Sequence, residues 1–164
     1  MQIERKLREL FTEKKLTLAL AESCTGGAMA SSLTQVAGAS AYFLGSFVVY
    51  SNELKQKVLR VSVETLEKKG AVSVEVVTQM LEGLFELTSA DWGVAVSGIA
   101  GPSGGSAEKP VGTVFAAIGR RGKEPEILRL QLKGNRQSVI QEASLLILEA
   151  LLRRVSQQFP LKEG

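Results

Sequence analysis

Apolar residues at the start of the chain recur with the spacing of an amphipathic helix. Ile3, Leu7, Leu10 and Phe11 would share one helical face. The pattern then changes to a mostly apolar run over residues 16–21, which is typical of a buried strand. The chain is therefore expected to begin with a helix that is followed by a strand.

The same kinds of element are expected further along the chain. Residues 42–50 end in a run of aromatic and β-branched side chains, which predicts a second strand. Ser51 and Asn52 are favourable capping residues ahead of a helix predicted over residues 53–60. This segment repeats the arrangement of a strand followed by a helix.

Two further serines have the features of helix N-caps. Ser62 and Ser73 are each followed by a glutamate in what would be the first turn, where the helix dipole favours an acidic side chain. Gly70 is expected to end the first of these helices. The second is expected to be long and to cover residues 73–89.

The second half of the chain predicts three more strands. They are expected over residues 92–97, 112–118 and 126–132. The segment 119–123 between the last two is rich in turn-forming residues. The last two strands should therefore form an antiparallel hairpin.

A final helix is predicted over residues 135–155, and its apolar face is unusually broad. The residues that follow the helical period are Val139, Ile140, Ala143, Leu146, Ile147, Ala150 and Leu151, and those that widen the face are Leu145, Leu148 and Leu152. Two interpretations stay open for this face. It could contact a partner subunit and form a homo-oligomer through the C-terminal helix, or it could lie buried between the sheet and another helix.

Together these elements predict an α/β protein. Helices alternate with about five strands, some joined by helical crossovers and some in a hairpin, which indicates a three-layer α/β/α domain with a mixed sheet. The chain has 164 residues and is 45% hydrophobic, which suits one well-buried core. Residues 1–164 are therefore expected to form a single domain.

Composition narrows the classes of partner. The formal net charge is only +3 and the charges are interspersed, so a small anionic ligand fits better than a nucleic acid. No apolar run is long enough to span a membrane, and the N-terminal pattern is not that of a signal peptide. A single cysteine excludes an internal disulfide and agrees with a reducing compartment. We therefore expect a cytoplasmic, soluble protein.

The segment 21–27, with the sequence AESCTGG, is the first candidate for chemistry. A strand, a tight glycine turn and a helix start would place Ser23 and Cys24 near a helix N-terminus, where a nucleophile is well supported. The chain contains no histidine, so a Ser-His or Cys-His pair is impossible within it. The proton of Ser23 would then go to a lysine, a carboxylate or a tyrosine. The alternative is that this segment is simply a capped helix start with a useful glycine pair.

Two further segments are candidates for anion binding. Residues 97–106 form a glycine-rich loop after a predicted strand, but they match neither the Walker A loop nor the dinucleotide fingerprint. They could form an anion nest or a mobile surface loop. Lys133 and Arg136 flank the predicted start of the last helix, where cations oppose the helix dipole. Arg136 would either hold a phosphate there or extend into water.

Several separated motifs resemble those of the CinA C-terminal domain family, in the same order. They are AESCTGG at 21–27, YSNELK at 50–55, GAVS at 70–73, SGIAGP at 97–102 with Gly104 and Gly105, and KPVGTV at 109–114. The resemblance covers roughly residues 5 to 155. It implies a nicotinamide-nucleotide amidase, which hydrolyses the carboxamide of nicotinamide mononucleotide to nicotinate mononucleotide and ammonia in pyridine nucleotide salvage. This reaction is expected to require neither a metal nor a cofactor.

The resemblance also implies roles for individual residues. The serine and lysine of the family fall on Ser23 and Lys55, a Ser-Lys dyad, with Tyr50 as a proton relay or as a platform for the nicotinamide ring. The oxyanion would be held by backbone N–H groups near Thr25, Gly26 and Gly27. The nucleotide phosphate would be held by the loop and its surroundings, through Gly98, Ile99, Ala100, Gly101, Gly105, Ser106, Thr113 and Arg136.

This assignment makes a physical demand on Lys55. An ordinary lysine has a pKa near 10.4 and would be protonated at neutral pH, so burial or a nearby cation must lower the pKa of Lys55 if it acts as a base. Adjacent side chains diverge in an extended turn, so only one of Ser23 and Cys24 should face the cleft. The resemblance implies that this is Ser23 and assigns Cys24 to packing. Glu22 could balance the pyridinium charge, cap a helix or lie at the surface. Tyr50 could equally be a strand-end aromatic of the core.

A rival interpretation belongs to a different functional class. Names in the family connected with competence and DNA damage suggest a non-catalytic nucleotide-binding or partner-binding domain. Such a protein needs the pocket but no activated lysine.

Overall fold

The computed structural model describes residues 1–159, and residues 160–164 of the expected domain lie outside the described part. A five-stranded sheet has the order β2-β1-β3-β4-β5. Its strands are β1 (Leu18–Glu22), β2 (Phe43–Val48), β3 (Trp92–Gly98), β4 (Thr113–Arg120) and β5 (Glu126–Gln131). β1 pairs in parallel with both β2 and β3, whereas β4 pairs antiparallel with β3 and β5. The predicted mixed sheet and its terminal hairpin are confirmed.

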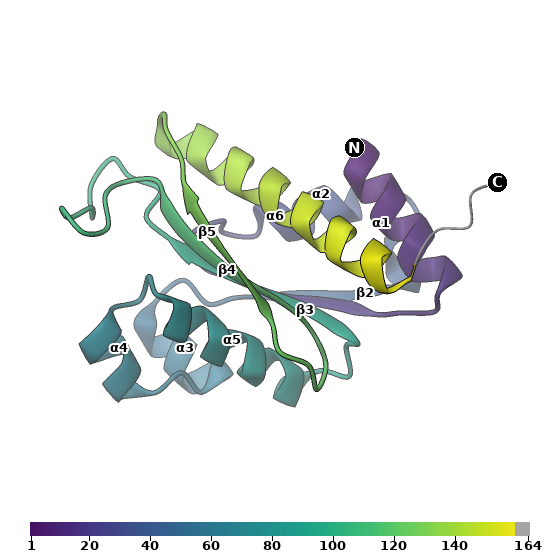
Figure 1. The fold of residues 1–164 in the computed structure, drawn as a ribbon, viewed down its shortest axis with the longest axis horizontal. Helices are drawn as coiled ribbons and strands as arrows, with labels where there is room; N and C mark the ends of the chain where they lie inside the picture. The colour runs from purple at the N-terminus through teal and green to yellow at the C-terminus, as the bar shows by residue number, and fades with distance from the viewer. Residues whose placement is uncertain (160–164) are drawn as a thin grey trace.

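Helices cover both faces of this sheet (Figure 1). One face carries α1 (Gln2–Glu13), α2 (Ala28–Thr34) and α6 (Arg136–Gln158), and the other carries α3 (Asn52–Leu59), α4 (Val63–Lys69) and α5 (Val74–Leu87). A short 3-10 helix, η1 (Ala39–Ala41), leads into β2. The three-layer α/β/α prediction is therefore correct.

β1 shows how the sheet separates two apolar cores. Successive side chains of a strand point to opposite faces. Leu18 and Leu20 pack in the core under α1, α2 and α6, whereas Ala19 and Ala21 pack in the core under α3, α4 and α5. All five residues of β1 are buried, which explains why its first four positions are all apolar rather than alternating with polar ones.

Local capping chemistry sets where four of the helices begin. The side chains of Ser51, Ser62, Ser73 and Asn135 each accept a hydrogen bond from the backbone N–H three residues further on. The two serine caps predicted at positions 62 and 73 are thus confirmed. Gly70 follows the last residue of α4, as expected. The predicted second strand is shorter than expected, because β2 ends at Val48, two residues before Tyr50.

The broad apolar face of α6 is largely buried within the chain itself. Val139, Ile147 and Leu151 are almost fully buried, and α6 contacts α1, α2 and β4. Leu145 is the large apolar side chain of this helix that stays exposed, at 46%. Burial between the sheet and other helices therefore accounts for most of the face. A homo-oligomer through this helix stays a prediction.

Close contact between α3 and α5 depends on Gly83. A Cβ atom built at position 83 would lie 2.0 Å from the carbonyl oxygen of Leu59, which is a backbone atom and cannot rotate away. We expect Gly83→Ala to lower the free energy of unfolding by about 3 kcal/mol, as overpacked cores do. That corresponds to a fall in Tm of roughly 6–12 °C for a chain of this size.

Thermal or urea unfolding measures this effect, with Glu82→Ala as the control. Glu82 is an exposed neighbour on the same helix, so its replacement should change stability by less than about 0.5 kcal/mol. Equal stabilities for the two variants would show that α3 and α5 can separate at no cost.

No helix within residues 1–159 is long and apolar enough to cross a membrane.

Candidate active site

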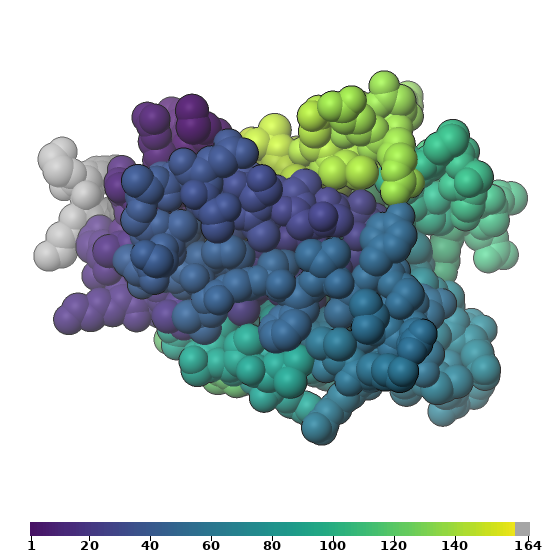
Figure 2. Space-filling model, turned by 180° about the vertical axis from the view of Figure 1, so that it is seen from behind, coloured from purple at the N-terminus to yellow at the C-terminus, as the bar shows by residue number. Residues whose placement is uncertain are grey.

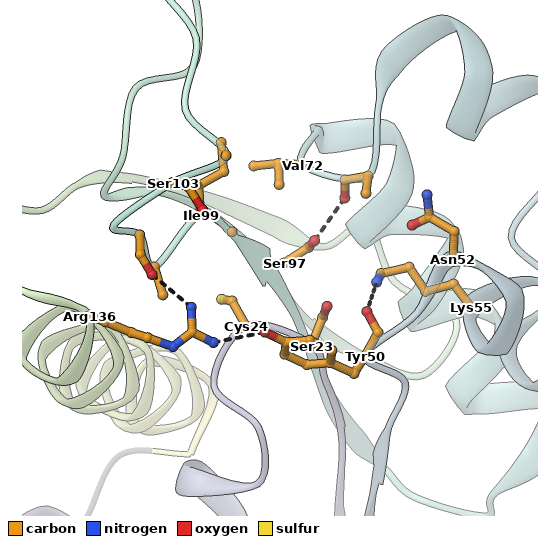
Figure 3. Close-up of a pocket in the computed structure, with 15 residues that line it drawn as sticks. Ser23, Cys24, Tyr50, Asn52, Lys55, Val72, Ser97, Ile99, Ser103 and Arg136 are labelled. Carbon is orange, nitrogen blue, oxygen red and sulfur yellow. Dashed lines mark hydrogen bonds between the residues drawn. The ribbon is translucent and has the colours of Figure 1, made fainter.

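A cavity of about 350 Å³ opens at the carboxyl ends of β1 and β3 (Figure 3). The segments that line it are the β3–β4 loop, the start of α6, the start of α3 and the connection between α4 and α5. These segments lie at the same end of the molecule (Figures 1 and 2). Its lining residues are Ser23, Cys24, Tyr50, Asn52, Lys55, Ala71, Val72, Ser97, Gly98, Ile99, Ala100, Gly101, Ser103, Gly104 and Arg136. The carboxyl ends of neighbouring parallel strands are where open α/β sheets place their ligands.

Ser23 sits at the first position after β1 and is held by the backbone on both sides. Its N–H donates to Val96 of β3 at 3.1 Å, and its carbonyl accepts from the N–H of Gly26 at 3.0 Å. Gly26 and Gly27 have φ values of 58° and 96°, which glycine adopts without strain. The side chain of Ser23 is 6% exposed and lines the cavity. A glycine turn therefore presents a nearly buried hydroxyl to the cavity, as predicted.

Lys55 is a buried amine without a counter-charge. It is 2% exposed, and its Nζ donates to the backbone carbonyl of Tyr50 at 3.1 Å. No carboxylate of the described chain forms a salt bridge with it. Burial lowers the pKa of Lys55, because a desolvated ammonium is disfavoured relative to the neutral amine. The pKa of Lys55 is therefore shifted in the direction that a base requires.

Cys24 corrects one expectation. The prediction that only one of the two adjacent side chains would face the cleft is wrong, because Ser23 and Cys24 both line the cavity. The backbone turns at this point instead of staying extended, so the side chains do not alternate. Burial raises the pKa of the Cys24 thiol to about 12. The thiol is therefore protonated at neutral pH, which disfavours it as a nucleophile.

Tyr50 and Arg136 meet across the mouth of the cavity. Arg136, the first residue of α6, donates from Nη1 to the carbonyl of Gly101 at 2.8 Å and from Nη2 to the hydroxyl of Tyr50 at 2.8 Å. Tyr50 is 57% exposed, so the alternative of a core aromatic is wrong. The arginine therefore turns toward the cavity rather than extending into water (Figure 3).

The oxyanion prediction requires a correction at two of its three positions. The N–H of Gly26 donates to the carbonyl of Ser23, and the N–H of Gly27 donates to the carboxylate of Glu22 at 3.1 Å. Neither amide is directed at a substrate. The N–H of Thr25 has no backbone acceptor within residues 1–159. The carboxylate of Glu22 takes the helix N-terminus that the sequence suggested for an anion.

Part of the predicted phosphate loop lies elsewhere. Gly98, Ile99, Ala100 and Gly101 line the cavity, but Gly105, Ser106 and Thr113 do not. The N–H and hydroxyl of Ser106 pair with the backbone of Lys109 in a local turn. The hydroxyl of Thr113 is buried within reach of Pro110 and Gln131. These two hydroxyl side chains therefore stabilise the loop rather than face a ligand.

Several lining residues were not singled out from the sequence as site residues. Ser97 is 1% exposed and its hydroxyl donates to the carbonyl of Ala71 at 2.8 Å, which ties the α4–α5 connection to β3. The sequence indicates Asn52 only as a helix cap. The sequence does place Ser97 at the end of the strand predicted over residues 92–97 and at the start of the candidate loop 97–106, which is the signal that indicates it.

The cavity is lined by basic side chains and by no acidic ones. Lys55 and Arg136 are its two basic lining residues, and no aspartate or glutamate of the described chain is among them. The N–H groups of Ser103 and Gly104 also have no backbone acceptor within the described residues. A cation and free amides at one end of a cavity suit an anionic group of a ligand.

Comparison with known proteins places this geometry in a family. The model of the CinA C-terminal domain matches residues 1–155. The chain belongs to the CinA C-terminal domain family. It is 46% identical over 159 residues to a nicotinamide-nucleotide amidohydrolase PncC of Enterobacter agglomerans, covering 92% of this chain and 96% of that protein.

Other relatives place the same domain in longer proteins and in solved structures. A CinA-like protein of Thermotoga sp. strain RQ2 is 47% identical over 92% of this chain, which spans only 36% of that relative. The solved structure of a competence/damage inducible protein from Agrobacterium tumefaciens has a TM-score of 0.90 at 39% identity and covers 93% of both chains. A competence damage-inducible protein A from Klebsiella pneumoniae has a TM-score of 0.91 at 35% identity, over 94% of this chain and 96% of that one. Membership of the family thus rests on sequence and fold together.

Proposed function

We propose that this CinA-family domain hydrolyses the carboxamide of nicotinamide mononucleotide, yielding nicotinate mononucleotide and ammonia. The observation that carries the proposal is a buried lysine without a counter-charge, in the same cavity as a nearly buried serine, in a chain that has no histidine. Burying an unpaired ammonium is unfavourable, so a neutral amine at this place suits a base. The name of the Enterobacter relative supports the substrate.

In the proposed first half-reaction, the Oγ of Ser23 attacks the carboxamide carbon and Nζ of Lys55 takes the hydroxyl proton. A bond forms between Oγ and carbon, and the carbonyl π electrons move to oxygen. The backbone N–H of Thr25, together with that of Cys24, is proposed to hold this oxyanion. When the tetrahedral intermediate collapses, the C–N bond breaks and the Lys55 ammonium donates its proton to the leaving nitrogen, which departs as ammonia.

The second half-reaction regenerates the enzyme. Water attacks the acyl-serine, and Lys55 accepts a proton from the water. The bond between carbon and Oγ then breaks, and the same proton returns to Ser23. The carboxylic acid product ionises in water. The half-exposed ring of Tyr50 is proposed as a platform for the nicotinamide ring. The backbone carbonyl of Tyr50 accepts the hydrogen bond that holds the amine of Lys55.

Ammonia release from nicotinamide mononucleotide by the wild-type chain tests the function directly. A coupled glutamate dehydrogenase assay detects ammonia, and chromatography identifies nicotinate mononucleotide as the second product in equal amount. Saturable binding of the nucleotide without either product would contradict the proposal and favour the rival, a non-catalytic nucleotide-binding domain. Absence of both turnover and binding would favour a partner-binding domain.

Arg136 is expected to contribute to affinity for the phosphate rather than to the chemical step. It carries five N–H donors, of which two are engaged by Gly101 and Tyr50, so others stay free for an anion. Arg136→Ala should raise KM roughly 10-fold to 100-fold with a smaller change in kcat, because a hydrogen bond to a charged group contributes about 1.5–3 kcal/mol.

The nucleoside, which lacks the phosphate, is the matched control for this prediction. With nicotinamide riboside as substrate, wild type and Arg136→Ala should have similar KM values. An equal loss on nucleotide and nucleoside would place the arginine in loop positioning instead, through its bond to Gly101.

A further inference from the structure

Glu22 is a buried ionisable side chain that the proposed reaction does not use. It is the last residue of β1, it directly precedes Ser23, and none of its surface is exposed. It forms no salt bridge with a lysine or arginine in the described chain. An uncompensated buried carboxylate is unfavourable unless hydrogen bonds satisfy it. Its partners therefore indicate what it is for.

The partners of Glu22 are all hydrogen-bond donors, and they come from two other segments. Its two oxygens accept bonds from Oγ1 of Thr25 at 2.7 Å, the N–H of Gly27 at 3.1 Å, the N–H of Met29 at 3.2 Å, the N–H of Ala30 at 3.0 Å and Oγ of Ser46 at 3.0 Å. Three of these donors are backbone amides at the start of α2, where amides lack acceptors within the helix, and the intervening amide of Ala28 donates to the carbonyl of Thr25. The carboxylate thus joins the end of β1 to the start of α2 and to β2.

Ser23 lies in the turn between Glu22 and the start of α2, which these hydrogen bonds hold. Its own N–H is held by Val96 of β3, while the turn that follows is held by Glu22 through Thr25 and Gly27. We propose that Glu22 is a positioning residue, which orients Ser23 for attack by clamping the turn between β1 and α2; this rests on the amidase function proposed above. β3 holds one side of the turn through the N–H of Ser23, and Glu22 holds the other side through Thr25 and Gly27.

The arrangement is selective for an acceptor-only side chain. Oε2 accepts three bonds and Oε1 accepts two, so no donor is needed at either position. Glutamine has nearly the same shape, but its amide group would direct two N–H groups at other N–H and O–H donors. Aspartate keeps both acceptors and the charge but is one methylene shorter. Glutamine therefore tests the acceptor requirement, and aspartate tests partial rescue.

The test compares kcat and KM of Glu22→Gln, Glu22→Asp and wild type with nicotinamide mononucleotide. We expect kcat of Glu22→Gln to fall roughly 100-fold, the effect of a misplacement of about 1 Å, with KM within about threefold of wild type. Glu22→Asp should be intermediate in kcat. Glu4→Gln is the matched control, because Glu4 is another buried carboxylate, 6% exposed, which bonds Ser32 of α2 and the N-terminal amine but does not line the cavity. It should keep kcat within about twofold.

A kcat of Glu22→Gln within about threefold of wild type, in protein shown folded by circular dichroism, would overturn the proposal. If Glu22→Gln does not fold, the double variant Thr25→Val with Ser46→Ala carries the test. It removes two donors but keeps the carboxylate and the helix amides, and kcat should fall about tenfold with KM unchanged. An unchanged kcat in that variant would overturn the proposal as well.

A second readout separates this proposal from the function on which it rests. If wild type releases no ammonia, the amidase function fails, and the reactivity of Ser23 is then measured with phenylmethylsulfonyl fluoride. Intact mass and peptide mapping follow the sulfonylated serine over time. Ser23 should be modified at least about tenfold more slowly in Glu22→Gln than in wild type or Glu4→Gln. Equal rates in all three proteins would reject the positioning role.

Discussion

Replacing Ser23 by alanine should abolish ammonia release from nicotinamide mononucleotide while leaving the fold and ligand binding intact. In the proposed mechanism Ser23 forms the covalent intermediate, and the neighbouring Cys24 thiol is a poor replacement because burial raises its pKa to about 12. We expect kcat to fall at least about 10⁴-fold, as for nucleophiles of other acyl-transfer enzymes. Stopped or continuous ammonia assays measure the rate, and thermal unfolding checks that Tm stays within a few degrees.

Cys24→Ala is the matched control for the serine variant. Both residues lie in the same turn and line the same cavity, but only the serine hydroxyl is assigned to attack. Cys24→Ala should keep kcat within about tenfold of wild type, the loss coming from a small packing change near the nucleophile. Full activity in Ser23→Ala together with an inactive Cys24→Ala would transfer the nucleophile to the thiol and contradict the mechanism.

Replacing Lys55 by methionine should have the second largest effect and should act on activity and stability in opposite directions. Without a base for the Ser23 proton, kcat should fall roughly 10³-fold or more. Lys55→Arg should be equally inactive, because an arginine stays protonated at every pH where the protein is folded. A Lys55→Met variant with a kcat close to that of wild type would reject the dyad but would keep the amidase function.

The pH dependence of the wild-type enzyme follows from the same lysine. In the proposed mechanism the neutral amine is the active form, so kcat/KM should rise with pH through the pKa of Lys55 in the folded protein. Because burial lowers that pKa, the rise should lie below the pH of about 10.4 expected for an exposed lysine. A rate that is flat from pH 6 to 10 would show that Lys55 does not act as the base. The profile of Lys55→Met should lack this rise.

Stability should respond to Lys55 in the direction opposite to activity. The pKa of Lys55 is lower in the folded than in the unfolded chain, so below about pH 10.4 the unfolded chain binds a proton more readily than the native one. This lysine therefore weakens the fold at neutral pH, and its unfavourable effect disappears as pH rises toward the unfolded pKa. Lys55→Met should raise the free energy of unfolding at pH 7 by the order of 1 kcal/mol. A fall in Tm at pH 7 would contradict this account.

The reach of sequence reasoning is clearest at the helix starts. The sequence alone indicates Ser62 and Ser73 as caps, because a cap accepts a hydrogen bond from an amide only three residues further on. The turn at Ser23 was recognised for the same reason, since a buried strand, two glycines and a helix follow one another directly. The family resemblance implies Lys55 through its motif, and its place one turn into α3 follows from the cap at Ser51.

Glu22 marks where local patterns stop being informative. The sequence left its role open between charge balance, capping and exposure, and the structure shows it bonded to the start of α2 and to Ser46 of β2. Ser46 is 24 residues away and becomes a neighbour only because β1 and β2 pair in parallel. The same glutamate occupies the amide of Gly27, which is why that oxyanion prediction was wrong.

What the sequence determined by itself about this protein was its order of helices and strands, the two-sided burial of its first strand and the residue types available for chemistry, since each depends on composition or on neighbours a few residues apart. Only the tertiary structure decided which groups share the cavity. Ser23, Ser97 and Arg136 come from three distant segments, and their meeting depends on strand pairing and on where α6 begins. The lowered pKa of Lys55 was likewise decided by burial, which no local pattern specifies.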